Sequence, residues 1–264
     1  MTMQWPYPRQ LAHRGGGTLA PENTLAGMRC ATAYGFRGVE FDVMLSRDGV
    51  PVLMHDPQFG RTIHAPGGVT DYTADALGML DAGAWLGPQF RGEPVCTLAQ
   101  VLAHCSAHGL WMNIEIKPSS DAVAAETGTV VAAATKAFFA QHYGNAAAAA
   151  NRAADDTPLP LFSSFSIDAL HAAQTAAPGI PRGWLVDKIA AGWQAQLEAL
   201  EAVSLHTSHR RLDAASAAAV RHAGYGLMCY TVNDPQRAQL LTQWGVDAYC
   251  TDRLDLFAPA PYCG

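Results

Sequence analysis

Long apolar runs are missing from this chain of 264 residues, and so is any excess of basic residues. The most apolar stretch, the alanine-rich AAAAANRAAD, is too short to cross a bilayer. The opening MTMQWPYPRQ has no apolar signal core, so we expect no secretory leader and a cytoplasmic location. A net charge of -6 disfavours a nucleic-acid binder, although a locally positive site for an anionic small molecule remains compatible with it.

Several motifs are also absent. The six cysteines form neither a CxxC pair nor a zinc spacing, and Cys30, Cys105, Cys229 and Cys250 are expected to be buried thiols. No GxGxxG follows the first expected strand and no Walker A motif is present, which argues against dinucleotide binding and against a nucleotide kinase or ATPase. With 49% hydrophobic and 15% charged residues, the composition is that of an ordinary globular protein.

What the sequence does contain is a regular alternation of short apolar runs and helical patterns. Strands are expected at 10–14, 38–45, 50–55, 110–117, 160–165, 183–187, 202–207, 225–233 and 246–252. Helices are expected at 23–35, 97–108, 121–143, 166–177, 189–201, 212–223 and 234–244. Without the extra hairpin strand at 50–55, eight strands remain, each followed by a helical segment. The pattern predicts one TIM (β/α)₈ barrel over residues 1–264; a doubly wound open sheet would usually have fewer strands.

Two segments interrupt this alternation. Residues 57–93, rich in Gly, Pro and Asp, are too long for a connector and are predicted to form a small subdomain inserted after strand 2. Such an insertion would lie over the barrel mouth, where specificity is built. Its residues Trp85, Leu86 and Phe90 fit the subdomain core, which we favour, or an apolar entrance. The low-complexity stretch 143–159 is expected to be a surface excursion.

Charged residues gather at the expected strand ends, where a barrel carries its chemistry. Glu40 and Asp42 are two residues apart on the second strand, and Glu115 and Lys117 are two apart on the next parallel strand. The strand period of two places each pair on one face. Three carboxylates in one cavity would repel strongly, and a hard divalent cation resolves this. Oxygen-only ligands favour Mg²⁺ or Ca²⁺ over zinc.

Two histidines, His13 and His55, flank this expected ion site, and Arg14 and Lys117 add positive charge. Two imidazoles can transfer protons in both directions, and cations can bind an anionic group. The combination fits chemistry on a phosphate ester. Each residue taken singly has a structural explanation, but the shared face on successive strands makes coincidence improbable. For His206 and His209 a rim hydrogen-bonding role stays open.

The stretch AHRGGGTLAPENTLAGMRCATAYGFRGVEFDVMLSRDGVPVLMHDPQFGRT resembles the N-terminal signature of the glycerophosphodiester phosphodiesterase family. The family pattern is HRG, PENT, a strand with E-x-D, and D-G-x-x-V-x-x-HD. The resemblance continues through LDAGAWLGPQFRGEPVCTLAQVL, NIEIKP, SSF, YTVND and GVDAYCTD, and so spans nearly the whole chain. It implies a TIM barrel with a small inserted subdomain matching residues 57–93.

The resemblance also implies a function. The enzyme would hydrolyse glycerophosphodiesters to sn-glycerol 3-phosphate and an alcohol, with His13 and His55 as the catalytic pair. Glu40, Asp42 and Glu115 would hold a divalent metal, and Arg14 and Lys117 would bind the substrate phosphate. In related enzymes the substrate's own hydroxyl attacks phosphorus, and water then opens the cyclic phosphate. As a hypothesis we assign His13 as the first base and His55 as the first acid, with roles exchanged in the second step.

Two positions depart from the family pattern. Cys96 replaces a usual Pro before Thr-Leu, from which we expect only a local loop change. Tyr230 replaces a usual Trp before T-V-N, so its ring is expected to wall the substrate pocket and its hydroxyl to be able to bind substrate. Head-group preference is therefore left open.

Three alternative functions compete with this reading. They are a related phosphodiesterase acting on lysophospholipids or phosphoinositides, a barrel that kept the fold and lost catalysis, and a sugar isomerase. Intact histidines and carboxylates disfavour the second, and the concentration of ligands on the early strands disfavours the third. We expect no stable membrane association and no nucleic-acid partner, with the choice of ion and of monomer or homodimer left open.

Overall fold

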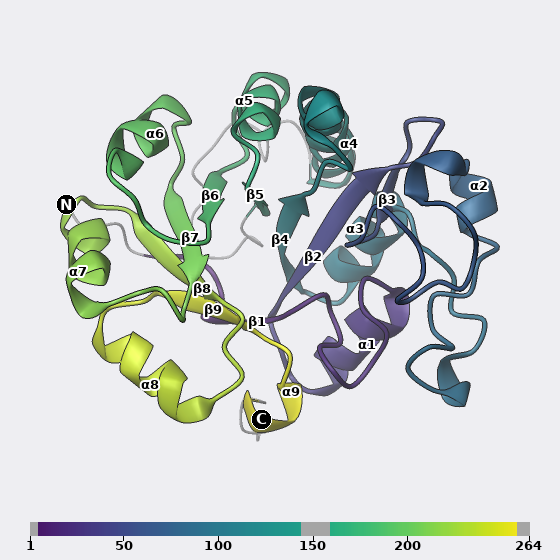
Figure 1. The fold of residues 1–264 in the computed structure, drawn as a ribbon, viewed down its shortest axis with the longest axis horizontal. Coiled ribbons are helices and arrows are strands. Elements are labelled where there is room, and N and C mark those ends of the chain that lie inside the picture. Colours follow the sequence, from purple (N-terminus) through teal and green to yellow (C-terminus); the bar gives the residue numbers. More distant parts are fainter. Residues whose placement is uncertain (1–4, 144–158, 258–264) are drawn as a thin grey trace.

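The computed structural model describes residues 5–143 and 159–257; the predicted excursion at 143–159 and Cys263 lie outside these ranges, apart from the excursion's two end residues. Nine strands form one sheet, in the order β1-β9-β8-β7-β6-β5-β4-β2-β3, and a pairing of β1 with β2 closes it. All neighbours are parallel except β3, which runs antiparallel to β2. Helices surround the closed strands (Figure 1), which confirms the predicted (β/α)₈ barrel.

The expected elements are present, most of them with slightly shorter ends. The strands are β1 (Gln10–Ala12), β2 (Gly38–Leu45), β3 (Pro51–Leu53), β4 (Trp111–Ile116), β5 (Leu161–Ser164), β6 (Arg182–Val186), β7 (Ser204–Ser208), β8 (Gly226–Tyr230) and β9 (Ala248–Thr251). The α-helices are α1 (Leu25–Ala33), α2 (Ala74–Leu77), α3 (Leu98–Ala107), α4 (Ala124–Tyr143), α5 (Ile167–Ala176), α6 (Trp193–Ala199), α7 (Ala214–His222), α8 (Pro235–Gln243) and α9 (Leu254–Phe257). The 3₁₀ turns are η1 (Val69–Asp71), η2 (Pro88–Phe90) and η3 (Asp121–Val123).

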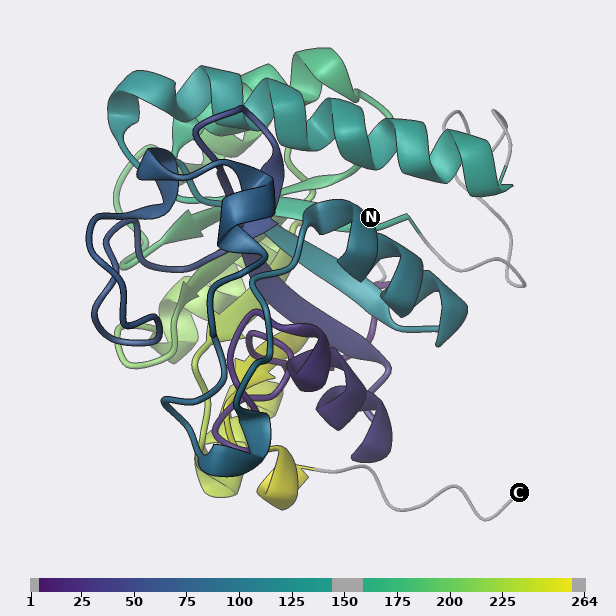
Figure 2. The ribbon, with the colours of Figure 1, turned by 90° about the vertical axis from the view of Figure 1, so that its right-hand side faces the viewer.

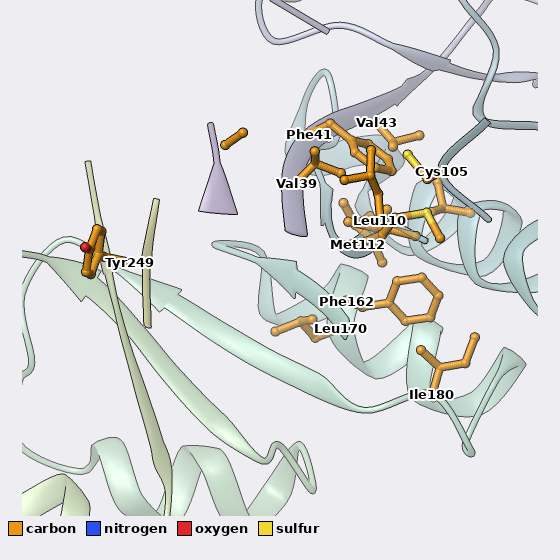
Figure 3. Packing of buried hydrophobic residues seen from close by; sticks show 14 of the residues in the cluster. Val39, Phe41, Val43, Cys105, Leu110, Met112, Phe162, Leu170, Ile180 and Tyr249 are labelled. Carbon is orange, nitrogen blue, oxygen red and sulfur yellow. The ribbon is translucent and has the colours of Figure 1, made fainter. Parts of the chain in front are cut away.

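Alternation along β2 separates the core from the chemistry. Val39, Phe41 and Val43 belong to the main hydrophobic core, where they pack with side chains of α3, β4 and β5 (Figure 3). Glu40 and Asp42, the residues between them, therefore face the inside of the barrel. All eight residues of β2 are buried, as expected of a strand with helices on one side and a filled barrel on the other.

At the amino ends of the strands, apolar side chains fill the barrel interior. Leu11, Trp111, Leu161 and Met228 form a separate buried cluster, against which residues of the N-terminal segment pack. The ring of Tyr7 stacks on Trp111 with 4.5 Å between centroids, and Gly226 makes room for the ring of Trp5. Because these side chains fill the amino ends of the strands, the interior is left open toward the carboxyl ends.

Residues 57–93 carry η1, α2 and η2 and leave the strand–helix alternation between β3 and α3. They lie outside the ring of helices, beside β3 and α1 (Figures 1 and 2). A small core of their own includes Ile63, Val69, Leu77 and Ala82, packed on Met44, Val52, Met54 and Val95.

Trp85, Leu86 and Phe90 are only half-buried and belong to none of the hydrophobic clusters of the described residues, so their predicted place in the subdomain core is wrong. Aliphatic side chains fill that core instead. Phe90 faces a groove against α1, and Trp85 Nε1 donates to the carbonyl of Ala82 at 3.0 Å.

Two expectations from composition can be compared with the structure. Cys105, Cys229 and Cys250 are buried as expected, whereas Cys30 is only half-buried because it borders the groove beside α1. Within residues 5–143 and 159–257, each helix is too short or too polar to span a membrane.

The contact between α4 and α5 generates a stability prediction. A Cβ at Gly128 would lie 2.2 Å from the carbonyl oxygen of Ala169. Gly to Ala inside a helix normally stabilises by about 1 kcal/mol, but here we expect Gly128→Ala to lower the free energy of unfolding by about 1–3 kcal/mol through overpacking. Urea unfolding measures it. Thr129→Ala, exposed on the next position, is the control, and a stabilised Gly128→Ala would disprove the close contact.

Candidate active site

A cavity of about 220 Å³ opens among the carboxyl ends of the strands. Every residue that the sequence singled out for the site lines it, including residues from both ends of the chain. The lining residues are His13, Arg14, Glu40, Asp42, His55, Asn113, Glu115, Lys117, Phe165, Leu185, His206, Met228, Tyr230, Thr231 and Cys250. None of these described lining residues comes from segment 57–93.

Glu40, Asp42 and Glu115 form a buried acidic cluster. Asp42 on β2 is paired in register with Glu115 on β4, and Glu40 precedes Asp42 on the same face. One carboxylate oxygen of each lies within 4.8 Å of the others. Glu40 Oε1 is buried and has no hydrogen-bond partner in the described part of the chain. Three convergent carboxylates, one of which has an unpartnered oxygen, fit the ligand preference of a hard divalent cation.

The pKa shifts of these three carboxyl groups show that their charges repel one another. Burial, followed by the charge of Asp42, raises the pKa of Glu40 and of Glu115. For Asp42 burial acts in the same direction, but the charges of Lys117 and Arg14 outweigh it and lower the pKa. In the chain alone, one carboxylate thus takes the negative charge at the expense of its neighbours.

Two cations already contact the cluster. Lys117 Nζ donates to Asp42 Oδ1 at 3.2 Å and to Glu115 Oε1 at 3.3 Å. Arg14 Nε lies 3.5 Å from Asp42 Oδ2, and its backbone N–H donates to Glu40 Oε2 at 3.1 Å. The cluster therefore attracts positive charge, and both cations stand where an anionic group entering the cavity would meet them.

The conformation of the loop after β1 accounts for its sequence, HRGGG. Arg14 has a φ of 51°, a left-handed conformation that turns its N–H toward Glu40. Gly17 also has positive φ, and a Cβ on it would lie 2.2 Å from the carbonyl oxygen of Asp252. The glycine allows the loop to pack on the end of β9, which brings Asp252 beside His13.

His13 and Asp252 form a hydrogen-bonded pair. His13 Nδ1 lies 2.5 Å from Asp252 Oδ1, and Asn233 Nδ2 donates to the other oxygen of Asp252 at 2.9 Å. An ionised carboxylate only accepts, so Nδ1 carries the proton and Nε2, 3.7 Å from Glu40 Oε2, remains to exchange one. Burial lowers the pKa of His13, but the hydrogen bond to Asp252 and the charge of Glu40 outweigh it and raise the pKa.

His55 has a matching partner in the next residue. His55 Nδ1 lies 2.5 Å from Asp56 Oδ1, while Asp56 Oδ2 accepts from Arg61 Nε at 2.7 Å. Burial is the largest influence on His55 and lowers its pKa. His13 and His55 thus both have Nδ1 held by an aspartate, the arrangement that fixes a tautomer and leaves Nε2 free.

The aromatic side chains at the rim are Tyr230 and Phe165. Their rings meet edge to face with 5.9 Å between centroids, and Phe165 is half exposed. The hydroxyl of Tyr230 donates to the carbonyl of Val186 at 2.8 Å. The proton of this hydroxyl is therefore engaged, and its oxygen could take part in a further hydrogen bond only as an acceptor.

His206 and His209, left open by the sequence, lie in different environments. His206 is fully buried on β7 and lines the cavity, with Nε2 2.9 Å from Ser204 Oγ. Gly183 makes room for its ring, and burial lowers its pKa to about 3, so the imidazole is neutral. His209 is half-buried and is not among the described lining residues.

The sequence reasoning missed the residues that orient this site. Asn23 donates from Nδ2 to Asp42 Oδ2 at 2.9 Å and accepts from the Asp42 N–H at 3.0 Å. The others are Glu22, Asp56, Arg61, Asn233 and Asp252. All six lie inside the motifs PENT, HDPQFGRT, YTVND and GVDAYCTD. Their presence in the motifs was a signal, but spacing alone does not reveal which polar side chain touches which.

Comparison with known proteins decides the family. The sequence pattern of the glycerophosphoryl diester phosphodiesterase family matches residues 13–256. The chain belongs to this family. Glycerophosphodiester phosphodiesterase of Caldanaerobacter subterraneus is 28% identical over 243 residues, covering 92% of this chain and 93% of the relative.

Solved structures of glycerophosphodiester phosphodiesterases and related phosphodiesterases share the fold. A phosphodiesterase of Oleispira antarctica, solved in complex with the product sn-glycerol-3-phosphate, is 36% identical, with a TM-score of 0.83 and 93% of each chain covered. A glycerophosphodiester phosphodiesterase of Agrobacterium tumefaciens is 25% identical, with a TM-score of 0.73 and coverage of 96% of this chain and 99% of that one. Family, relatives and fold agree on an enzyme of this class.

The His13–Asp252 pair leads to a titration prediction. In protein kept free of divalent cations with EDTA, Asp252→Asn is expected to lower the pKa of His13, because it removes the negative charge that makes the hydrogen bond to Nδ1 favour the imidazolium. NMR titration of the histidine ring signals measures this. Asp56→Asn is the matched control and should act on His55 instead. An unchanged His13 pKa in Asp252→Asn would show that the pair does not form.

Proposed function

We propose that the chain hydrolyses glycerophosphodiesters to sn-glycerol 3-phosphate and an alcohol. The observation that carries the proposal is one cavity that holds a three-carboxylate cluster, two Asp-supported histidines and two cations. This combination supplies a cation site, proton transfer at two points and binding of an anionic phosphodiester. Family membership identifies the class of ester on which it would act.

Glu40, Asp42 and Glu115 would hold one divalent cation. The donor set is oxygen only, which favours Mg²⁺ or Ca²⁺, and the unpartnered Oε1 of Glu40 gives the ion a ligand atom without breaking a hydrogen bond. A bound ion would act as a Lewis acid toward substrate oxygens. Asn23, through its two bonds to Asp42, would keep that ligand in place.

His13 and His55 would carry the protons. In the first step, one imidazole takes the proton of the glycerol hydroxyl beside the esterified carbon, as that oxygen bonds to phosphorus. The other donates a proton to the leaving alcohol as its P–O bond breaks, which gives a cyclic phosphate. In the second step the roles exchange and water opens the ring. The order, with His13 as first base, stays a prediction, because a bound cation would share the Glu40 charge that helps to raise the pKa of His13.

Arg14 and Lys117 would bind the phosphate. Both line the cavity and both now contact the acidic cluster, so neutralisation of that cluster would free their donors for phosphate oxygens. Tyr230 would wall the glycerol site, and Phe165, whose ring meets that of Tyr230 edge to face, would extend this wall. Segment 57–93 would be an insertion within a single catalytic domain. Its residue Arg61 donates a hydrogen bond to Asp56, the partner of His55.

Lysophospholipids and phosphoinositides are less suitable substrates. A lipid chain would need an apolar entrance, and Trp85, Leu86 and Phe90 are not among the described residues lining the cavity. Glycerophosphocholine and glycerophosphoethanolamine, with small polar head groups, match a cavity of about 220 Å³.

The metal assignment predicts dependence on a divalent ion. EDTA should abolish release of glycerol 3-phosphate from glycerophosphocholine, and Mg²⁺ or Ca²⁺ should restore it. Glu40→Gln, Asp42→Asn and Glu115→Gln should each lower turnover by about a hundredfold or more, and calorimetry should show weakened ion binding. Glu198→Gln, an exposed carboxylate on α6, is the control. Normal turnover in EDTA and in all three variants would refute the metal site while leaving the reaction intact.

The histidine assignment predicts that His13→Ala and His55→Ala each lower kcat by about a hundredfold or more, with His171→Ala on the exposed face of α5 as control. Glyceryl 4-nitrophenyl phosphate separates the two roles, because its leaving group departs without a proton. Release of 4-nitrophenol in a single turnover reports the first step alone; there the variant that lacks the first acid should regain most of its rate, and the variant that lacks the first base should not. Recovery of His13→Ala rather than His55→Ala would reverse the assigned order.

A further inference from the structure

Arg61 lies in segment 57–93 and contacts two carboxylates that support different parts of the site. Its Nε donates to Asp56 Oδ2 at 2.7 Å. Its Nη1 and Nη2 donate to the two oxygens of Glu22 at 2.6 and 2.7 Å. With three nitrogens engaged on two carboxylates, the planar guanidinium has one orientation in which all these bonds form.

Each of these carboxylates has a second partner that lines the cavity. Asp56 accepts from His55 Nδ1 through its other oxygen, and Glu22 Oε1 also accepts from Arg14 Nη1 at 2.9 Å. Arg61 is therefore linked to the His55 imidazole through one carboxylate and to the Arg14 guanidinium through the other. Arg61 itself is not among the described residues that line the cavity.

The arrangement is also asymmetric in exposure. The side chain of Glu22 is 12% exposed and that of Asp56 is 32% exposed. Asp56 is adjacent to His55 in the chain, so without a second partner its short side chain could adopt rotamers that abandon the ring. Because Arg61 holds the far oxygen of Asp56, it restricts the carboxylate to the rotamer that meets Nδ1.

We propose that Arg61 is a positioning residue through which segment 57–93 fixes His55 and Arg14 at the same time. This inference rests on the proposed function, in which His55 transfers a proton and Arg14 binds the phosphate. The bond to Asp56 acts on proton transfer, and the bonds to Glu22 act on substrate binding. The segment thus influences catalysis from behind the site.

The two connections can be separated by steady-state kinetics on glycerophosphocholine. Asp56→Asn is expected to lower kcat with little change in KM, and Glu22→Gln to raise KM more than it lowers kcat. Arg61→Gln should both lower kcat and raise KM, each by about tenfold. Arg61→Lys should reverse only part of the changes in kcat and KM that Arg61→Gln causes, because one ammonium cannot hold both carboxylates in the geometry of the guanidinium.

Arg29→Gln is the matched control. Arg29 on α1 pairs with Glu93 at 3.2 Å and joins the same segment to the barrel, but neither residue is among those lining the cavity. If Arg61 served only to attach segment 57–93 to the barrel, Arg61→Gln and Arg29→Gln would have similar kinetic constants. Arg29→Gln is expected to stay within about twofold of the parent in both constants, and thermal unfolding confirms that each variant folds.

A double variant and a readout without turnover complete the test. Asp56→Asn should have little further effect in an Arg61→Gln background, and full additivity would overturn the proposal. The ring ¹⁵N shifts of His55 should show loss of the fixed Nδ1–H tautomer in Arg61→Gln and not in Arg29→Gln. If the parent enzyme shows no turnover but this shift difference is present, the proposed function fails and the positioning role stands. If Arg61→Gln matches Arg29→Gln in both kinetics and shifts, the positioning role is refuted.

Discussion

Three carboxylates share the inside of one barrel, and the rest of the site is arranged around their mutual repulsion. Glu40, Asp42 and Glu115 are buried or nearly so, in a region where charge is poorly screened. The fold tolerates them because Lys117, Arg14 and Asn23 hold Asp42 in its charged form. Each of these two cations is also a group that can bind an anion, so the residues that stabilise the buried carboxylates are the ones proposed to bind the substrate phosphate.

The separation of stability from chemistry follows from the strand period. On β2 and β4 one set of side chains joins the outer core, and the alternate set faces the interior. Along the inner face of β4, the residues run from Trp111 in the apolar floor, through Asn113, to Glu115 at the cavity. The amino ends of the strands are filled by rings, and the carboxyl ends carry charge. Substitutions at the two ends of one strand should therefore act on different properties of the protein.

Sequence patterns were enough for the fold and for the charged residues that line the cavity, whereas apolar lining residues such as Phe165 and Leu185 were not predicted. The alternation of strands and helices predicted the barrel, and pairs such as Glu40 and Asp42 could be placed on one face because the period of a strand is fixed. The supporting residues were harder to predict. Asp252 meets His13 across 239 positions of sequence, and this contact exists only because β9 pairs with β1 when the barrel closes. The core of segment 57–93 was assigned to Trp85, Leu86 and Phe90, yet it is filled by other side chains, among them Ile63, Val69 and Leu77. The irregular backbone of the segment has no period from which its inward positions can be predicted.

The closure of the barrel between β1 and β2 is slight. A single residue pair, Ala12 with Val39, joins these strands, whereas six pairs join β2 to β4. Just above this seam the Arg14 N–H donates to the carboxylate of Glu40 and continues the connection with a side chain where the backbone ladder stops. One carboxylate thus contributes both to the contact between β1 and β2 and to the charge at the mouth of the barrel. An ion held by Glu40 would therefore contact the same carboxylate that extends the connection between β1 and β2 beyond their single backbone pair.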